Sequence, residues 1–389
     1  MISSIVLRSV NHFVLKKQHL TDDSKIDDVI QIAKDIGGLH GTSATGPYLS
    51  LFARSNTFRR ENLAVEMSKK KNMARIRYVR NTIHILPKNF IPVAYAGTTK
   101  MAEVTAAQFS KNMGITPTQY GRISNKILKI LKGRGLTTRE IKKKLRTATN
   151  ITSIVNLMCD KGLLVRSLPR EGWKSTQHVY FLFEDYYPDL DLTLYDEKEA
   201  RGEIVKRYIL SFGPVSEQDI AWWTGFPKLQ VKEILEGLGD EVSSIEISEL
   251  EREYLIHSAE REALQSLEVP EHPVVSVLPG LDPYVMGYKD RERYLHPKHH
   301  KMVFDRSGNA TSTILINGRV VGIWDLEEAL VKIFYLTAVE KDARTKIRSK
   351  VSDVGKFIAE RPVQIKVCDS MVPLPKRTAG SFMSPLKDG

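Results

Sequence analysis

Four segments in the middle of the chain decide the fold: ISNKILKIL (residues 123–131), TTREIKKKL (137–145), NITSIVNLMCDK (150–161) and HVYFLF (178–183). In the first segment, isoleucine and leucine recur three and four residues apart, which predicts an amphipathic helix. Gly133 and Gly135 end that helix, and Thr137 or Thr138 can cap a second one.

The third segment predicts another helix, which Gly162 ends because glycine adopts a left-handed conformation at little cost. Residues 163–165 then form a predicted strand, 169–175 a loop, and 178–183 the returning strand. Three helices followed by a strand, a loop and a strand are typical of a winged helix.

The same order recurs twice, more loosely. Upstream, we expect helices at 26–36, 47–54 and 60–69 and strands at 75–79 and 82–86. Downstream, we expect helices at 203–212, 217–224 and 228–238 and strands at 242–247 and 253–257.

From Pro273 the pattern changes to alternation. Short strands are predicted at 274–278, 301–304, 312–316, 320–324, 331–335 and 363–367, with a basic helix at 341–356. Strands of this kind favour a small barrel or sandwich.

The fold class predicted is therefore α+β, with three tandem winged-helix units and a small barrel-like C-terminal domain. The boundaries we expect are 1–115 (first unit, with the motif loop described below), 116–190, 191–268, 269–370 (β-rich) and 371–389 (a flexible tail).

Composition narrows the function. The 389 residues carry a formal charge of +12, which favours a polyanionic partner. The chain shows no apolar run of membrane-spanning length and no secretory leader. It also lacks the glycine-rich motifs that bind phosphate groups, which argues against an ATPase or a dehydrogenase. Two unrelated cysteines, Cys159 and Cys368, indicate a reducing cytoplasm. We expect a cytoplasmic, nucleoid-associated monomer that needs no cofactor or metal.

The positive charge is concentrated in two runs, and these supply the predicted DNA-binding residues. The first comprises Arg59, Arg60, Lys69, Lys70, Lys71, Arg75, Arg77 and Arg80. The second includes Lys126, Lys129, Lys132, Arg139, Lys142, Lys143, Lys144 and Arg146, with Glu140 as its one acid. Trp173, on the second predicted wing, is a further candidate for groove contact, although loop packing explains it equally well.

A solvated helix face is the alternative for one such run. Two adjacent runs with few acids favour phosphate binding, since uncompensated like charge costs stability. The third unit is acidic, so we expect units one and two to hold duplex DNA.

Several stretches resemble the AlkZ/YcaQ-type winged-helix DNA glycosylases, which excise bulky alkylated bases and unhook interstrand crosslinks. The resemblance spans about residues 5 to 335 and rests on these segments: GLHGT (38–42), PYLSLFAR (47–54), NTIHILP (81–87), YILSFGP (208–214), DIAWWTG (219–225), LPGLDPYVMGYKDR (278–291) and NGRVVGIW (317–324). It implies three winged helices, a following β-barrel and a basic concave face for duplex DNA.

The catalytic motif of that family is Gln-Φ-Gln or Gln-Φ-Asp, where Φ is apolar. The matching positions are His40, Gly41 and Thr42, so both polar residues differ. The resemblance implies that His40 orients or deprotonates water and that Thr42 helps to hold it. The alternative is structural: Gly37 and Gly38 close a helix, and Thr42, Ser43 or Thr45 caps the next.

Other candidates have simpler explanations. His296, His299 and His300 fit a solvated loop better than a metal site, and Asp282 fits an Asp-Pro turn. Trp222 and Trp223 fit a helix core better than a platform for base stacking. Two functions remain: a glycosylase for alkylated or crosslinked bases, and a non-catalytic DNA binder such as a regulator or lesion-shielding protein.

Overall fold

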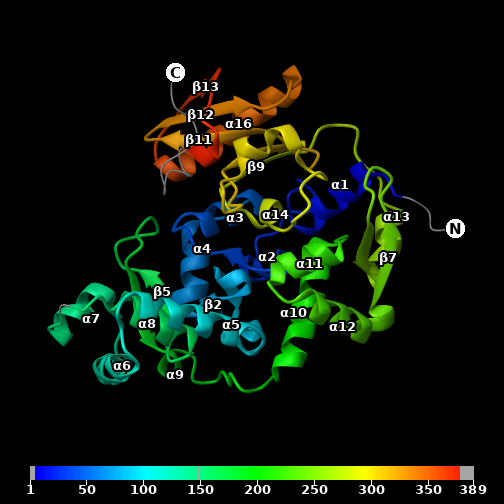
Figure 1. Ribbon diagram of the computed structural model, residues 1–389. Coiled ribbons are helices and arrows are strands. Elements are labelled where there is room, and N and C mark those ends of the chain that lie inside the picture. Colours follow the sequence, from blue (N-terminus) through cyan, green and yellow to red (C-terminus); the bar gives the residue numbers. More distant parts are fainter. Residues whose placement is uncertain (1–4, 148, 377–389) are drawn as a thin grey trace.

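The computed structural model describes residues 5–147 and 149–376 and has mixed α and β content (Figure 1). The N-terminal part contains α1 (Leu7–Lys17), α2 (Val29–Asp35), β1 (Leu39–His40), α3 (Gly46–Arg54), α4 (Arg60–Ala64) with a π-helical turn at Val65–Lys69, β2 (Met73–Arg77), β3 (Ile83–Pro87) and α5 (Ile91–Asn112). The predicted helices and hairpin of this region are present. The 22-residue helix α5 was not predicted.

The next part contains α6 (Pro117–Leu131), β4 (Leu136–Thr137), α7 (Thr138–Leu145), α8 (Thr152–Asp160), β5 (Leu164–Pro169), β6 (His178–Leu182) and α9 (Phe183–Tyr186). Its local signals are confirmed. The Thr137 hydroxyl accepts a hydrogen bond from the Glu140 amide, and the Glu140 carboxylate accepts one from the Thr137 amide, forming a capping box. Gly162 follows α8 with φ +70°.

One six-stranded sheet joins these two parts, in the order β1-β3-β2-β5-β6-β4. The two parts meet where Arg75 of β2 pairs with Arg166 of β5. The predicted hairpins of the first two units therefore share one sheet. Sequence patterns gave no sign of this, because strand pairing between distant segments leaves no local signal.

The third predicted unit has α10 (Glu197–Phe212), α11 (Glu217–Thr224), α12 (Lys228–Leu238), β7 (Val242–Glu246), β8 (Glu253–His257) and α13 (Arg261–Gln265). The start of the chain packs here. Ile5 pairs with Ile247, and Leu7, Val10 and Phe13 share a core with the β7–β8 hairpin. Helix α1 therefore packs on this distant hairpin.

The C-terminal part contains β9 (Val275–Leu278), α14 (Pro283–Met286), α15 (His300–Val303), β10 (Thr313–Ile316), β11 (Arg319–Glu327), β12 (Leu330–Tyr335), α16 (Lys341–Ala359) and β13 (Gln364–Val367). The strand order β13-β12-β11-β10-β9 is open, with β12 and β13 parallel and connected through α16. The described strands therefore form a sheet covered by a helix, without the expected barrel closure. The strand expected at 301–304 is wrong: these residues lie in and just after α15, because so short an apolar run fits either structure.

The start of the expected flexible tail is packed, since Leu374 is buried in a 3₁₀ turn at Leu374–Lys376. Residues 377–389 of that prediction lie outside the described residues.

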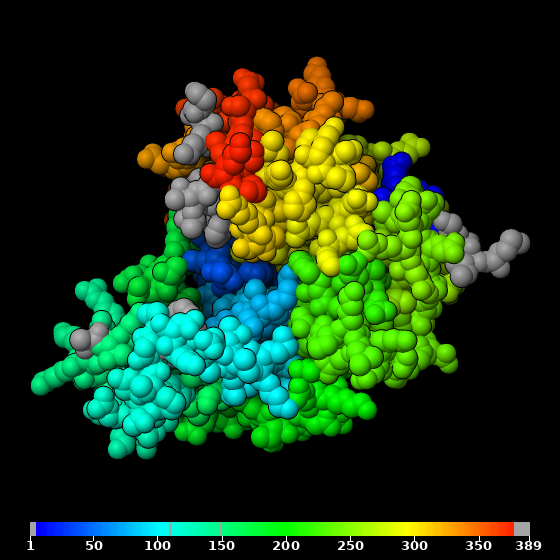
Figure 2. Space-filling model, in the orientation of Figure 1, coloured from blue at the N-terminus to red at the C-terminus, as the bar shows by residue number. Residues whose placement is uncertain are grey.

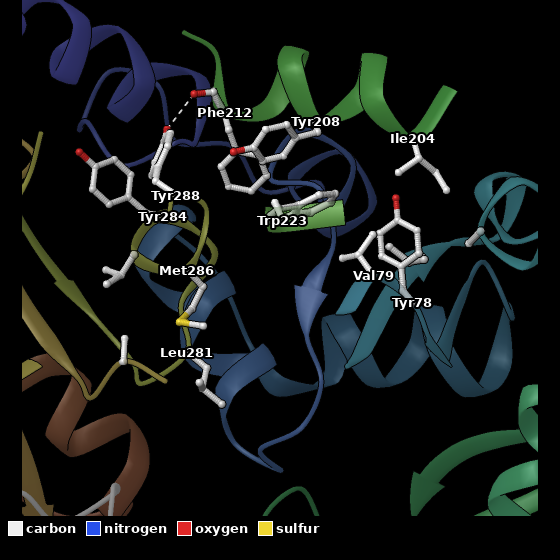
Figure 3. Close-up of a cluster of buried hydrophobic side chains, with 14 of the residues drawn as sticks. Tyr78, Val79, Ile204, Tyr208, Phe212, Trp223, Leu281, Tyr284, Met286 and Tyr288 are labelled. Atoms are coloured by element: carbon white, nitrogen blue, oxygen red, sulfur yellow. Dashed lines mark hydrogen bonds between the residues drawn. The ribbon is translucent and has the colours of Figure 1, made fainter. Parts of the chain in front are cut away.

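A large aromatic core connects the first unit, the third unit and the C-terminal part (Figure 3). Trp223 of α11 stacks on Tyr208 of α10, with 4.7 Å between the ring centres, and contacts Tyr78 edge-on, with 5.9 Å between the ring centres. The Tyr288 hydroxyl donates to the Phe212 carbonyl at 2.8 Å, the dashed contact in Figure 3. Trp223 is therefore a core residue, as predicted.

A fully buried ion pair reinforces this junction. Arg54, at the end of α3, donates to both carboxylate oxygens of Asp282 at 2.8 Å, and both side chains have no exposed surface. The Ser50 hydroxyl and the Tyr284 amide also donate to Asp282, which caps α14. The turn interpretation of Asp282 is confirmed, and its carboxylate is fully occupied.

We expect Asp282→Asn to lower the free energy of unfolding by about 3–5 kcal/mol, because Arg54 then stays buried without a countercharge. Urea denaturation measures this. Arg170→Gln breaks the exposed Arg170–Glu140 pair and should change stability by less than about 1 kcal/mol. Equal losses in the two variants would contradict the role of the buried pair.

Candidate functional site

The loop that carries His40 is built on a glycine turn. Gly37 and Gly38 follow α2 with φ +70° and +103°, and a Cβ on Gly38 would lie 2.5 Å from the Leu86 side chain. Glycine is therefore needed at 38 for both conformation and space. After this turn His40 enters β1 and pairs with His84 of β3. The helix-closing role expected for the glycines is confirmed.

Arg75 of β2 forms hydrogen bonds to the backbone of this loop. Its guanidinium donates to the carbonyls of Gly41 and Ser43 and to His178 Nε2, the last at 2.7 Å. A Cβ on Gly41 would lie 3.2 Å from Arg75 Nε and 3.1 Å from Ile83, so a larger residue needs a shift of its neighbours. Arg75 is 5% exposed. Arg75, a predicted DNA-binding residue, is therefore engaged inside the fold in this structure.

His40 itself is 8% exposed, and its ring lies 5.3 Å from the ring of His84. Burial lowers the pKa of His40 to about 4, and the nearby charges of Arg80 and Arg75 act in the same direction. The imidazole is therefore neutral near pH 7. Its Nδ1 is buried and has no hydrogen-bond partner among the described residues.

Thr42 lies two residues further on and is exposed. Of the three cap candidates, Thr45 stands at the N-cap of α3 without a side-chain cap hydrogen bond, and the Ser43 hydroxyl accepts from the Gly46 amide at 3.2 Å. Thr42 therefore does not cap α3 and borders the His40 loop with its side chain at the surface.

The first basic run is only partly available to a ligand. Arg77 pairs with Asp160 at 2.9 Å, and Arg60 lies 4.4 Å from the Trp173 ring and pairs with Glu360. Arg80 covers the Trp222 ring at 4.0 Å. Arg60 and Arg77 thus have acidic partners within the fold, whereas Arg80 has none among the described residues. The first basic run therefore does not form one freely exposed face.

The other members of this run lie nearer the solvent. Arg59, Lys69 and Lys70 are exposed, although Lys70 also pairs with Glu66. Lys71 is partly buried, and its ammonium lies 4.5 Å from the Tyr186 ring.

The second basic run is exposed throughout. The side chains at the surface of α6, α7 and their flanks are Lys126, Lys129, Lys132, Arg139, Lys142, Lys143, Lys144 and Arg146. None forms an ion pair with another described residue. Figure 2 shows this lobe in cyan and teal beside a recess whose floor is the blue N-terminal surface. The charge is therefore free and lies next to a concave face.

Trp173 is partly buried and packs against Tyr48 at 5.3 Å and Phe357 of α16 at 5.6 Å. These contacts support the loop-packing alternative, and the groove contact of Trp173 stays a prediction. Trp173 packs the β5–β6 loop against helix α16.

Two functional candidates escaped sequence reasoning. Trp222 was grouped with Trp223 as core, yet it is partly exposed beneath Arg80 and Arg291. One sequence signal pointed to a role for Arg291, namely its place at the end of the family-like segment 278–291. Among the described residues, no group of three His, Cys, Asp or Glu side chains could hold a metal ion, and no helix is long and apolar enough to cross a membrane.

The model of the family described as "DNA glycosylase AlkZ-like" matches residues 33–357. The chain belongs to the AlkZ-like DNA glycosylase family. A curated relative, the interstrand DNA cross-link repair glycosylase of Streptomyces sahachiroi, is 23% identical over 290 residues, covering 68% of this chain and 76% of the relative.

The solved structure of Streptomyces sahachiroi DNA glycosylase AlkZ matches this AlkZ-like chain with a TM-score of 0.77 at 17% identity. The match covers 94% of this chain and all of the other. The two proteins therefore share a fold over 94% of this chain, and the family resemblance seen in the sequence is confirmed.

We expect the His40 imidazole of this AlkZ-like protein to titrate with a midpoint of about 4. Burial and two guanidinium groups oppose its protonation, so it takes up a proton only well below its ordinary pKa of 6.5. Histidine-selective NMR measures this, with His40→Gln identifying the resonance. A midpoint near 6.5 would show that the ring is solvated and contradict the geometry.

Proposed function

We propose that this chain is a DNA glycosylase that hydrolyses the N-glycosidic bond of alkylated bases in duplex DNA and unhooks interstrand crosslinks. Family membership supports this, as does the relative described as an interstrand DNA cross-link repair glycosylase. The observation that carries the proposal is the neutral, buried His40, with its unpartnered Nδ1, at the position of the motif. Three tandem winged helices before the C-terminal sheet form part of the proposal.

Neutrality explains how histidine can replace glutamine. A neutral imidazole can both donate and accept a hydrogen bond, as a side-chain amide can, whereas a protonated imidazole only donates. Glycosidic cleavage develops positive charge on the sugar, and a neutral acceptor can orient water toward it without adding repulsion. His40 would hold that water, and the exposed hydroxyl of Thr42 would bind its other side.

The lesion supplies much of the driving force. A base alkylated on a ring nitrogen already carries positive charge, so it leaves as a neutral molecule and needs little acid catalysis. A site with a weak base and no paired carboxylate is therefore sufficient for this substrate class. His40 and Thr42 are proposed as the catalytic residues.

The exposed lysines and arginines of α6 and α7 would bind the phosphates of the duplex beside the recess. Arg59, Lys69 and Lys70 extend this surface from the first basic run. Binding as a monomer, and a location with the nucleoid in the cytoplasm, stay predictions.

We expect the wild-type protein to release 7-methylguanine from duplex DNA and to leave abasic sites. His40→Ala should reduce the single-turnover rate by about 100-fold, while His40→Gln retains a substantial part of it. Because His40 loses its acceptor when protonated, the wild-type rate should fall only as the pH drops toward about 4. His40→Gln should lack this decline. Alkali cleavage of the product DNA measures the rate.

Tight binding with no abasic product above the spontaneous rate would contradict catalysis and favour the non-catalytic DNA binder. An unchanged rate in His40→Ala would remove His40 from the mechanism.

We expect the triple change of Lys126, Lys129 and Lys142 to glutamine to weaken duplex binding and flatten its salt dependence. Each lost phosphate contact removes about 0.9 from the slope of log affinity against log salt concentration. Fluorescence anisotropy between 50 and 200 mM salt measures both quantities.

The control removes the same charge from the third unit, by changing exposed Lys198, Lys228 and Lys232 to glutamine. Its salt slope should match that of the wild-type protein. Equal effects in the two triple variants would show that net charge alone governs binding.

A further inference from the structure

Two arginines from distant segments lie on one tryptophan at the meeting point of three parts of the fold. Arg80 comes from the turn between β2 and β3, Trp222 from α11, and Arg291 from the segment after α14. The Trp222 ring centre is 4.0 Å from the Arg80 guanidinium carbon and 5.8 Å from that of Arg291.

Both guanidinium groups are held in place. Arg291 donates to the Gly308 carbonyl at 3.2 Å and to His300 Nε2 at 2.8 Å, and it lies 3.4 Å from the Phe304 ring centre. Arg80 projects from a backbone with φ +50°, in the left-handed region that side chains seldom adopt. A residue held in this way often serves a function.

The turn that carries Arg80 is fixed on both sides. Asn81 also has a positive φ of 56°, and its carbonyl accepts a hydrogen bond from Arg77 at 2.7 Å. On the other side, a Cβ on Gly225 would lie 3.7 Å from the Arg80 amide nitrogen, so the turn sits close to the end of α11.

Neither cation forms an ion pair with any described residue, and the Nε atom of each is buried without a hydrogen-bond partner. Burial lowers the pKa of Arg80 to about 10, and the charge of Arg291 acts in the same direction. Burial also lowers the pKa of Arg291, and the charge of Asp305 opposes this shift. A pair of partly buried like charges costs free energy, which a bound anion would recover.

Arg80 lies close to the motif loop. It stands in the turn that leads into β3, where His84 pairs with His40 of β1, and its charge lowers the pKa of both imidazoles. An anion bound by these arginines would therefore sit near the reacting nucleotide, away from the lysines of α6 and α7.

We propose that Arg80 and Arg291, positioned by Trp222, bind the backbone phosphate adjacent to the nucleotide whose base is removed. This rests on the proposed glycosylase function and deepens it. The planar fork of a guanidinium can donate to two oxygens of one phosphate, whereas a stacked base would have to displace Arg80 from the ring face that it covers. Binding of this phosphate would hold the attached sugar opposite His40.

Binding to a duplex with a tetrahydrofuran abasic site tests this pair without any need for excision. One version carries the natural phosphates, and another carries a neutral methylphosphonate at a phosphate flanking the abasic site. On the natural duplex, Arg80→Gln and Arg291→Gln should each bind about tenfold more weakly than the wild type. The methylphosphonate should weaken the wild type by at least the same factor and should weaken each variant clearly less than it weakens the wild type, because each variant has only one arginine contact left to lose.

Arg291→Lys keeps the positive charge and should restore part of the sensitivity to the methylphosphonate. Lys232→Gln, on exposed α12, should bind and respond as the wild type does. Urea midpoints confirm that each variant is folded. A variant that fails to fold is replaced by its lysine counterpart in the comparison.

The assignment would be overturned if the methylphosphonate, at either flanking position, weakened binding of the variants by as large a factor as it weakens binding of the wild type. If that occurs while the wild type excises 7-methylguanine, the glycosylase function stands and only the phosphate site fails. If the coupling is found but excision is not, the phosphate site stands and the enzymatic activity fails.

Discussion

The buried pair of Arg54 and Asp282 is the constraint on which the arrangement of the site depends. It fixes the end of α3, just after the His40 loop, to the segment 281–288 of the C-terminal part. That segment supplies Tyr284 and Tyr288 to the shared aromatic core, and the residues that follow it place Arg291 near Trp222. Because both charges lack solvent, they tolerate little movement, and the parts they connect are held at one relative position.

The basic residues of this protein have two different roles. Arg75 and Arg77 are used inside the fold, where one holds the motif loop and the other binds Asp160. The lysines of α6 and α7 stay exposed and unpaired, which suits reversible contact with phosphates. Arg80 lies between these classes, partly buried and without an anion. The net charge of +12 therefore overstates how many basic side chains are free to bind DNA.

Sequence reasoning succeeded where the signal was local. Thr137 and Gly162 marked helix ends, and the spacing of isoleucines located α6 and α8. It failed where distant segments decide the outcome. The pairing of β2 with β5, the docking of α1 on the β7–β8 hairpin and the burial of Arg75 all depend on contacts far apart in the chain. The motif position of His40 came from the family resemblance, whereas its neutral state required the surroundings that only the fold supplies.

The central claim is that the neutral ring of His40 faces the sugar of the damaged nucleotide. A crystal structure of the protein bound to a duplex with a tetrahydrofuran abasic site tests it most directly. We expect the abasic sugar within about 5 Å of the His40 imidazole, close enough for one bridging water. An abasic sugar bound elsewhere, with the His40 loop still packed and distant from the DNA, would contradict it.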